Sequence, residues 1–325
     1  MTVVWVIWAA VVLDLLIGDP RWLPHPVIGM GKAIRRVEGW IRQRATTAQS
    51  LKRAGMLLPV IVAGGSFVLA WLLLVLCGAI HPWLAWGVEI VLIATTIAIK
   101  GLREAGLEVY GHLRSGNIAE ARRSLSMVVG RDTGHLDEPE IVRGTVETVA
   151  ENIVDAVIAP LFFALIGGAP LAMAYRAVNT LDSMVGYKND KYQHIGWASA
   201  RLDDIANWIP ARLTAGLLTM VAAMLSLQWK KAIKMVRRDA RKHPSPNSGF
   251  PESAVAGALG VRLGGENSYQ GVISFRAYMG DPERPLEAEH IRVTNRLLLG
   301  VSVLFTLLGT LVLGLVAAAG GSLWI

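Results

Sequence analysis

Three carboxylates recur at every fourth position just before an apolar segment. Glu147, Glu151 and Asp155 lie within residues 143–163, RGTVETVAENIVDAVIAPLFF. On a helix these positions share one face, and like charges four apart destabilise it by roughly 0.2–0.5 kcal/mol per pair. A divalent cation would relieve that repulsion, because Mg²⁺ typically binds one or two carboxylates and keeps its other positions for water and phosphate. The alternative is a solvated face paired with Arg143, but ionisable groups entering a bilayer usually face a cavity.

A second polar stretch, residues 176–212, alternates cations with carboxylates and amides. Bases that bind phosphate oxygens, beside acids that bind a metal ion, are typical of phosphate–metal sites. The alternative is a polar loop whose local ion pairs contribute little to stability. We favour the site, because Asn and Asp are dense here beside Tyr, Gly and Trp. Its candidate residues are Asn179, Asp182, Tyr187, Lys188, Asp190, Lys191, Arg201 and Arg212.

Two further stretches are rich in turn-forming residues. Residues 14–31, DLLIGDPRWLPHPVIGMG, and residues 241–265, RKHPSPNSGFPESAVAGALGVRLGG, combine Gly, Pro, Ser and Asn. Such turns present backbone N–H groups to anions, but many serve only as turns. The sequence contains no GxxxxGKS/T, GxSxG or HExxH motif, which argues against a P-loop, a serine-hydrolase elbow and a zinc protease.

Composition and charge predict a membrane protein. Of 325 residues, 53% are hydrophobic and 18% are charged, whereas soluble domains carry about 25% charged residues. Much of the net charge of +7 lies in long loops, and Lys and Arg mark loops that stay cytoplasmic. We therefore do not expect nucleic-acid binding. The single cysteine, Cys77, lies in an apolar segment, so no disulfide can form within the chain.

The apolar segments predict an all-α fold, a polytopic integral-membrane helical protein with large cytoplasmic loops. Several of them reach the ~18–20 residues that a spanning helix needs. We expect one integral-membrane domain over residues 1–325, with cytoplasmic insertions at 100–152 and 230–296.

For residues 156–175 and 208–229, the topology that hydropathy predicts conflicts with the expected function. Two full crossings there would place the polar stretch 176–207 outside the cell. Pro160 and the GGAP at 167–170 interrupt a simple helix, and irregular backbone is tolerated at membrane depth where it is packed in protein. We therefore predict that the chain folds back and keeps 176–207 on the cytoplasmic side. The four expected spans begin near Val3, Met56, Pro82 and Leu297.

Taken together, these stretches resemble the CobD/CbiB family of cobalamin biosynthesis. The resemblance is carried by DLLIGDPRWLPHPVIGMG, GRDT (130–133), ETVAENIVDAVIAPLFF, YRAVNTLDSMVGYKNDKY, GWASARLDDIANWIPARL and HPSPNSGFPESAVAGALGVRLGG. It implies an adenosylcobinamide-phosphate synthase of the cell inner membrane. Such an enzyme is an ATP-dependent ligase that joins adenosylcobyric acid, a corrinoid, to (R)-1-amino-2-propanol phosphate, with Mg²⁺ as the expected metal. The implied partners are these substrates, the lipid bilayer and other enzymes of the corrin pathway.

The resemblance and the residue pattern together give a set of expected roles. ATP, the corrin propionate and the amine phosphate are all anionic, so acids that bind Mg²⁺ should be mixed with cations. The expected catalytic residues are Glu147, Glu151, Asp182, Lys188 and Asp190. The expected metal ligands are Glu151, Asp155, Asp182 and Asp190. The expected substrate- and phosphate-binding residues are Arg131, Asn152, Asn179, Tyr187, Lys191, Arg201, Arg212, His243, Ser245 and Asn247.

Two other functions stay open at this level. Asn179, Asp182 and Asp190 loosely imitate the Asp-rich motif of a Mg²⁺-dependent membrane prenyltransferase. A non-enzymatic membrane sensor or scaffold would need no dense acid–base cluster. The sequence also leaves open whether the amine is phosphorylated or free, which residue contacts which substrate, and the oligomeric state.

Overall fold

A computed structural model describes residues 2–18 and 25–320 and divides the chain into two compact units. Residues 19–24, the centre of the turn-rich stretch 14–31, lie outside the described residues. Unit 1 comprises Met1–Ala98, Ala159–Asn207 and Thr306–Ile325, and unit 2 comprises Ile99–Ile158 and Trp208–Phe305.

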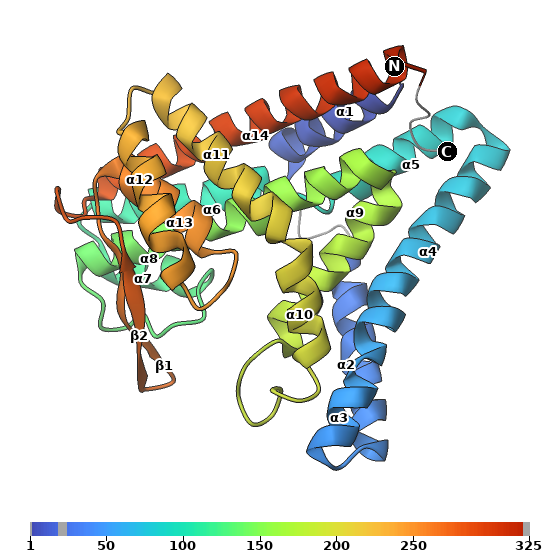
Figure 1. The fold of residues 1–325 in the computed structure, drawn as a ribbon, viewed down its shortest axis with the longest axis horizontal. Helices are drawn as coiled ribbons and strands as arrows, with labels where there is room; N and C mark the ends of the chain where they lie inside the picture. The colour runs from blue at the N-terminus through green and yellow to red at the C-terminus, as the bar shows by residue number, and fades with distance from the viewer. Residues whose placement is uncertain (1, 19–24, 321–325) are drawn as a thin grey trace. The chain divides into compact units, whose positions relative to one another are not determined.

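Unit 1 is helical throughout its described elements. Helix α4 runs beside α9, and both contact α5 (Figure 1). Apolar side chains such as Ile34, Leu58 and Leu181 are fully buried and form the core between α2, α4 and α9. The elements are α1 (Thr2–Ile17), α2 (Pro26–Arg44), α3 (Ala48–Gly55), α4 (Leu57–Ile80), α5 (Pro82–Ala94), α9 (Ala159–Val185), α10 (Trp197–Ala206) and the end of α14 (Ala288–Ala318).

Helix α9 is interrupted where the GGAP sequence predicted a break. Gly167 has φ −148° and ψ 29°, and Gly168 has φ 64° and ψ −161°. The second conformation is open almost only to glycine, because a Cβ would clash with the backbone. The helix resumes near Pro170, whose missing N–H is tolerated in a first turn. The predicted interruption is therefore confirmed.

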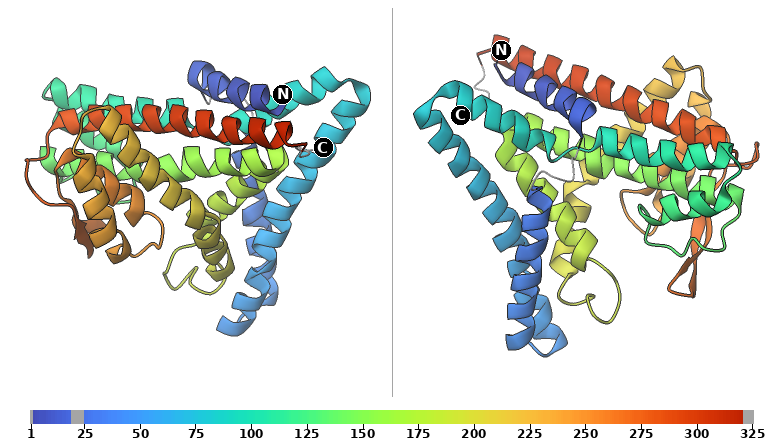
Figure 2. Two further views of the ribbon diagram at one scale, coloured as in Figure 1. Left: turned by 45° about the horizontal axis from the view of Figure 1, so that its top comes forward. Right: turned by 180° about the vertical axis from the view of Figure 1, so that it is seen from behind.

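Unit 2 combines helices with one small sheet. Helices α11, α12 and α13 pack on one another, and α13 also contacts α8 and the hairpin (Figure 2). The elements are α6 (Ile99–Arg114), α7 (Ile118–Ser126), α8 (Glu138–Ile153), the π-helix η1 (Val154–Ile158), α11 (Trp208–Met224), α12 (Trp229–Asp239), the 3₁₀ turn η2 (Ala240–Lys242), α13 (Gly249–Leu259), β1 (Leu263–Tyr269), β2 (Val272–Met279) and the first part of α14.

Helix α8 carries the predicted carboxylate stripe and has well-defined ends. Asp137 and Glu140 form a capping box at its N-terminus, which satisfies backbone N–H groups that have no partner within the helix. At its C-terminal end the α-helix passes into the π-helix η1, which contains Asp155. The wider π turn breaks the 3.6-residue period. Glu151 and Asp155 are both partly exposed, and the expectation that Asp155 continues the face of Glu147 and Glu151 stays a prediction.

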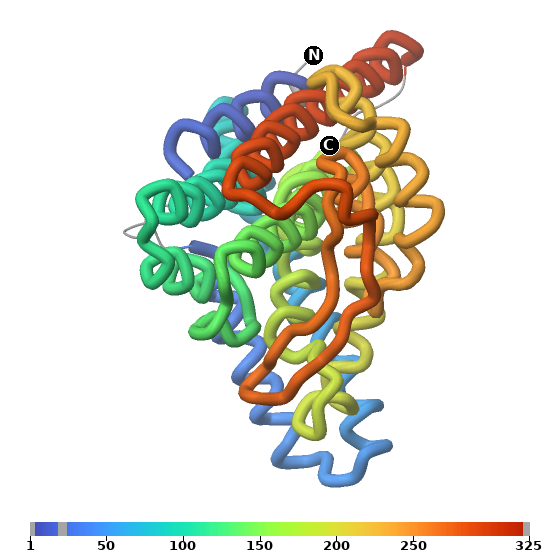
Figure 3. The backbone as a smooth tube through the Cα atoms, turned by 90° about the vertical axis from the view of Figure 1, so that its left-hand side faces the viewer, coloured from blue at the N-terminus to red at the C-terminus, as the bar shows by residue number. Residues whose placement is uncertain are grey.

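Strands β1 and β2 form an antiparallel hairpin that projects from the helices of unit 2 (Figure 3). Gln270 and Gly271 at its tip have φ of 53° and 79°, as a tight hairpin turn requires. The all-α prediction did not include this hairpin. Residues 263–269, LGGENSY, show no alternation of apolar and polar side chains that would predict a strand.

Four helical stretches are long and apolar enough to cross a membrane. They are Ala48–Ile80, Pro82–Arg114, Glu138–Val185 and Ala288–Ala318, while Val4–Ile17 and Trp208–Met224 are shorter apolar helices. The polytopic helical membrane fold is thereby confirmed. Three stretches match spans predicted from sequence, the predicted span from Val3 is one of the shorter apolar helices, and Glu138–Val185, where the fold-back is predicted, also has the length and composition of a span. The fold-back, the side of the membrane and the cytoplasmic insertions stay predictions.

Candidate functional site

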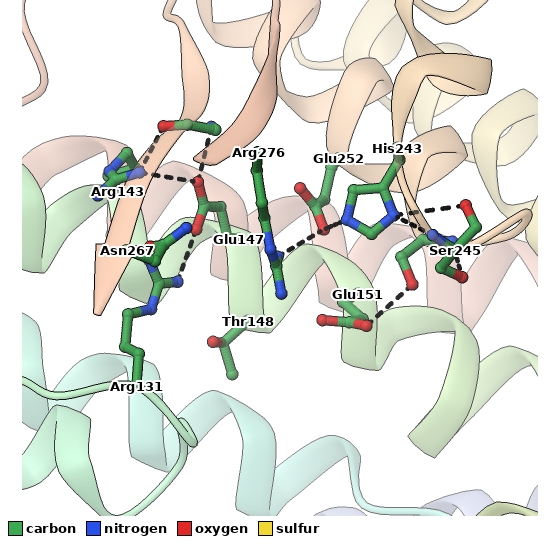
Figure 4. Close-up of polar contacts among 12 residues, drawn as sticks. Arg131, Arg143, Glu147, Thr148, Glu151, His243, Ser245, Glu252, Asn267 and Arg276 are labelled. Atoms are coloured by element: carbon green, nitrogen blue, oxygen red, sulfur yellow. Dashed lines mark hydrogen bonds and ion pairs between the residues drawn. The ribbon is translucent and has the colours of Figure 1, made fainter. Parts of the chain in front are cut away.

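Charged side chains in unit 2 form a cluster that joins α8 to the hairpin and α13 (Figure 4). We call it the unit 2 cluster. Its carboxylates come from α8 and α13, and its cations come from the loop before α8, from α8, from the loop before α13 and from β2. Its members are Arg131, Arg143, Glu147, Glu151, His243, Glu252 and Arg276.

Glu147 is the most fully paired carboxylate of the cluster. It is 1% exposed. Its Oε2 accepts a hydrogen bond from Arg131 Nη2 at 2.6 Å, and its Oε1 accepts one from the backbone N–H of Gly264 at 2.8 Å. Arg143 Nη1 lies 3.9 Å from the same Oε1. Glu147 therefore joins α8 to β1 and to the loop that precedes α8. This contact gives it a positioning role, and its predicted catalytic role stays a prediction.

Arg131 and Arg143 also bind the strand directly. Arg143 donates hydrogen bonds to the carbonyl oxygens of Gly264 and Glu266, the latter at 2.7 Å. Arg131 donates to the side-chain oxygen of Asn267. Gly264 has φ 82°, and a Cβ there would lie 2.4 Å from the carbonyl oxygen of Ala277. This glycine therefore allows β1 and β2 to approach each other at the irregularity in their register between Leu263 and Gly265.

Glu151, one turn beyond Glu147, contacts the HPSPNS loop. Its Oε1 accepts a hydrogen bond from Ser248 Oγ at 2.9 Å. Ser245 Oγ accepts hydrogen bonds from the backbone N–H groups of Asn247 and Ser248, each at 3.2 Å, and the N–H of Ser245 donates to His243 Nδ1 at 3.0 Å. The structure thus brings together four residues that sequence reasoning assigned to the site, His243, Ser245, Asn247 and Glu151.

Glu252 is a buried acid that sequence reasoning missed. It is 0% exposed, and neither carboxylate oxygen has a hydrogen-bond partner among the described residues. His243 Nε2 lies 3.6 Å and Arg276 Nη1 4.0 Å from its Oε1. Burial, followed by the charges of Glu147 and Glu151, raises the pKa of Glu252 well above its usual value. Burial likewise lowers the pKa of His243, so both groups favour the neutral form despite their ion-pair distance.

A small cavity of about 120 Å³ opens beside these residues. Its polar lining includes Arg131 and Arg276 as cations and Glu151 as an acid, with Thr148, Asn152 and Tyr269 between them. Arg131, Glu151 and Asn152 were predicted for the site. Arg276 was not, because an arginine inside an unrecognised strand gives no local signal.

The predicted residues of unit 1 form a separate group on α9 and α10. Asn207 Nδ2 donates to Asp203 Oδ2 at 3.1 Å, and Tyr175 Oη donates to Asn207 Oδ1 at 2.9 Å. Burial, and next the charge of Asp182, raises the pKa of Asp203 to about 7. Asp182 was predicted for the site, whereas Asp203 was only part of the polar stretch. Two neighbouring carboxylates disfavour each other's charge, and a divalent cation bound between them would relieve that repulsion.

The remaining predicted residues of unit 1 make local contacts. Tyr187, Lys188, Asp190 and Lys191 are exposed in the loop after α9. Asp190 accepts a hydrogen bond from Gln193 at 3.5 Å. The others contact as follows: Arg201 pairs with Asp204 at 3.4 Å, Asn179 accepts from Arg176 at 3.5 Å, and Lys191 lies over the Tyr192 ring. Exposed pairs of this kind contribute little to stability.

Arg212 belongs to unit 2. Its guanidinium lies 4.2 Å from the ring centroids of Trp208 and Phe250 and donates to the side-chain oxygen of Asn247 at 3.4 Å. Within residues 2–18 and 25–320, no group of three or more His, Cys, Asp or Glu side chains is placed to hold a metal ion. The predicted metal ligands Glu151, Asp155, Asp182 and Asp190 stay a prediction.

Known proteins resemble the chain over most of its length. The family model described as CobD/Cbib protein matches residues 7–298. "Cobalamin biosynthesis protein CobD" of Geobacter metallireducens is 50% identical over 93% of this chain and 94% of its own. "Cobalamin biosynthesis protein CbiB" of Salmonella arizonae is 47% identical over 90% of this chain and 92% of its own. No solved structure matches. The resemblance noted in the sequence is thereby confirmed, and the chain belongs to the CobD/CbiB family.

Proposed function

We propose that the chain is an adenosylcobinamide-phosphate synthase that uses ATP to join adenosylcobyric acid to (R)-1-amino-2-propanol phosphate. Family membership supports a role in cobalamin biosynthesis. The observation that best supports the reaction class is the unit 2 cavity, where two arginines, Arg131 and Arg276, and two glutamates, Glu147 and Glu151, line a polar space. Paired cations of this kind suit phosphorylated substrates, and a nearby carboxylate suits an amine.

The chemistry explains why such a site is needed. A carboxylate does not react with an amine at neutral pH, so its oxygen first attacks the terminal phosphorus of ATP and ADP leaves. The amine nitrogen then attacks the acyl carbon, and phosphate leaves as the amide bond forms. The first step moves a phosphoryl group between anions and the second releases phosphate as the acyl group passes to the amine, so positioning and charge neutralisation provide most of the catalysis.

We assign the parts of this reaction by contact and charge. Arg276 donates hydrogen bonds to phosphate oxygens in the cavity, beside the ion pair of Arg131 and Glu147. Glu151 accepts hydrogen bonds from the substrate ammonium group and takes its proton before the nitrogen attacks. Glu147 already has hydrogen-bond donors on both oxygens, so it keeps Arg131 in position.

Mg²⁺, as the expected metal, fits Asp182 and Asp203 of unit 1 better than the α8 acids. Magnesium needs only one or two carboxylates and completes its coordination with water and phosphate, so the absence of a cage of three acids among the described residues does not count against it. The pKa of Asp203, raised by burial and by the charge of Asp182, supports this assignment, because a cation would favour the ionised form of both acids. When bound, the metal would neutralise phosphate charge. Glu151, Asp155 and Asp190 stay predicted ligands.

A reconstituted assay tests the proposal. The full chain in nanodiscs is given adenosylcobyric acid, ATP, MgCl₂ and the amine phosphate, and mass spectrometry follows the amide product while a coupled assay follows ADP. We expect product only with all four components and almost none from Glu151→Gln. Product without ATP, or transfer from a prenyl diphosphate in its place, would refute the ligase assignment.

A further inference from the structure

Arg276 is the cation of the unit 2 cavity that lacks a hydrogen-bonded carboxylate among the described residues. Its Nη2 donates to Tyr269 Oη at 3.3 Å, and its Nη1 comes no closer than 4.0 Å to Glu252. The side chain descends from β2, and its guanidinium points toward the space between Thr148 and Glu151 (Figure 4). Arg131, by contrast, already pairs with Glu147 at 2.6 Å.

Glu252 does not supply the missing negative charge. Its oxygens have no hydrogen-bond donors among the described residues, and its side chain is completely buried. An ionised carboxylate is rarely left in that state, because burying an unpaired charge costs much more than holding the neutral acid. The raised pKa of Glu252 agrees with this. The charge of Arg276 is therefore available to an anion in the cavity.

The size of the cavity selects the kind of anion. About 120 Å³ is well below the ~300–1,000 Å³ of sites for drug-sized ligands. It is thus too small for a corrin ring or a whole nucleotide. Its lining offers a cation at Arg276 and an acid at Glu151, which suits a short molecule with a negative and a positive end.

We infer that this cavity is the subsite for the small amine substrate, with a phosphate monoester bound at Arg276 and the ammonium group facing Glu151. The inference rests on the proposed function and adds to it which substrate the unit 2 cluster holds. Arg276 would also suit the terminal phosphate of ATP, so the experiment separates the phosphate of the amine substrate from that of ATP.

The test compares Arg276→Gln and Arg276→Lys with Arg262→Gln, a matched control at an exposed arginine just before β1. For each variant, KM is measured for ATP, for (R)-1-amino-2-propanol phosphate and for the unphosphorylated amine. We expect Arg276→Gln to raise KM for the amine phosphate about 10- to 100-fold, the loss that one charge-assisted hydrogen bond implies. KM for ATP and for the free amine should stay within about 3-fold, and Arg276→Lys should recover part of the loss.

An equal rise in KM for phosphorylated and free amine, or a rise confined to ATP, would overturn the inference. Binding without turnover separates it from the ligase proposal. In ³¹P NMR, wild-type chain and Arg262→Gln should broaden the amine phosphate resonance in the absence of ATP, while Arg276→Gln should not. Broadening without any ATP-dependent product would leave the subsite standing and refute the ligase. Equal broadening by Arg276→Gln would refute the subsite, whatever the turnover.

Discussion

Replacing Glu147 by alanine should destabilise unit 2 far more than changing its neighbour Glu151. The substitution removes the acceptor of the Arg131 ion pair at 2.6 Å and the acceptor of the Gly264 N–H at 2.8 Å. Both donors are left in a site where Glu147 itself is 1% exposed. Glu151→Gln, in contrast, removes charge from a partly exposed side chain with one bond to Ser248.

The two expected losses differ enough to measure. Breaking a buried ion pair by removing one partner costs about 3–5 kcal/mol, whereas one hydrogen bond contributes about 1 kcal/mol. At about 2–4 °C of Tm per kcal/mol, Glu147→Ala should lower Tm by roughly 6–20 °C. Glu151→Gln should lower it by no more than about 4 °C, although it removes activity.

Thermal unfolding of the chain in detergent, followed by Trp fluorescence, measures both losses. The exposed Glu138→Ala on the same helix controls for losing an acid from α8. The double variant Arg131→Met/Glu147→Leu should recover part of the loss, because it removes the buried charge of Arg131 together with that of its partner. A Tm for Glu147→Ala within 2 °C of the wild type would refute the reasoning. So would a double variant no more stable than Glu147→Ala.

Three further predictions use other parts of the chain. Burial raises the pKa of Asp239, but hydrogen bonds from neighbouring cations and a backbone N–H outweigh it and lower the pKa to about 2. Its stabilisation is therefore present above pH ~4 and lost as the pH falls through ~2; Asp239→Asn should lower Tm at pH 7 and by only about half as much at pH 3, and an equal loss at both would contradict this. Asp203→Asn should raise the Mg²⁺ concentration at half-maximal activity about 10-fold or more, with KM for the amine phosphate unchanged; an unchanged Mg²⁺ titration would exclude Asp203 as a ligand. A Ser183→Cys/Cys77→Ser variant in intact cells should resist an impermeant thiol reagent added outside and react in inverted vesicles; labelling from outside would refute the fold-back model.

The sequence predicts the helices of this protein better than its site. Long apolar runs and the break at Gly167–Gly168 follow from hydropathy and from backbone freedom, both of which are local properties. The hairpin does not follow, because LGGENSY lacks strand periodicity and pairs with β2 only through its tertiary setting. Arg276 and the backbone acceptors of Arg143 were missed for the same reason.

Glu252 shows a second limit of what the sequence alone can predict. In sequence it is a single acid in a run of small residues, PESAVAGALG, and nothing local separates it from an exposed helix residue. Its surroundings come from other elements, because α13 contacts α8 and the hairpin and the nearest charged groups are His243 of the preceding loop and Arg276 of β2. Only the assembled unit therefore reveals that this acid is held without hydrogen bonds, and hence favours its neutral form.

The three carboxylates that precede the apolar segment after α8 are not equivalent. Glu147 is paired with Arg131 inside the unit, Glu151 lies at the cavity, and Asp155 is in the π turn that follows α8. Because Glu147 neutralises Arg131, the charge balance of the cavity depends on Arg276 and Glu151. The ion pair of Arg131 and Glu147 thus leaves Arg276 and Glu151 for a ligand that carries one negative and one positive group. Because Glu147 pairs within the protein and Arg276 faces the ligand, the acidic residues of α8 can lie beside a substrate that is itself largely anionic.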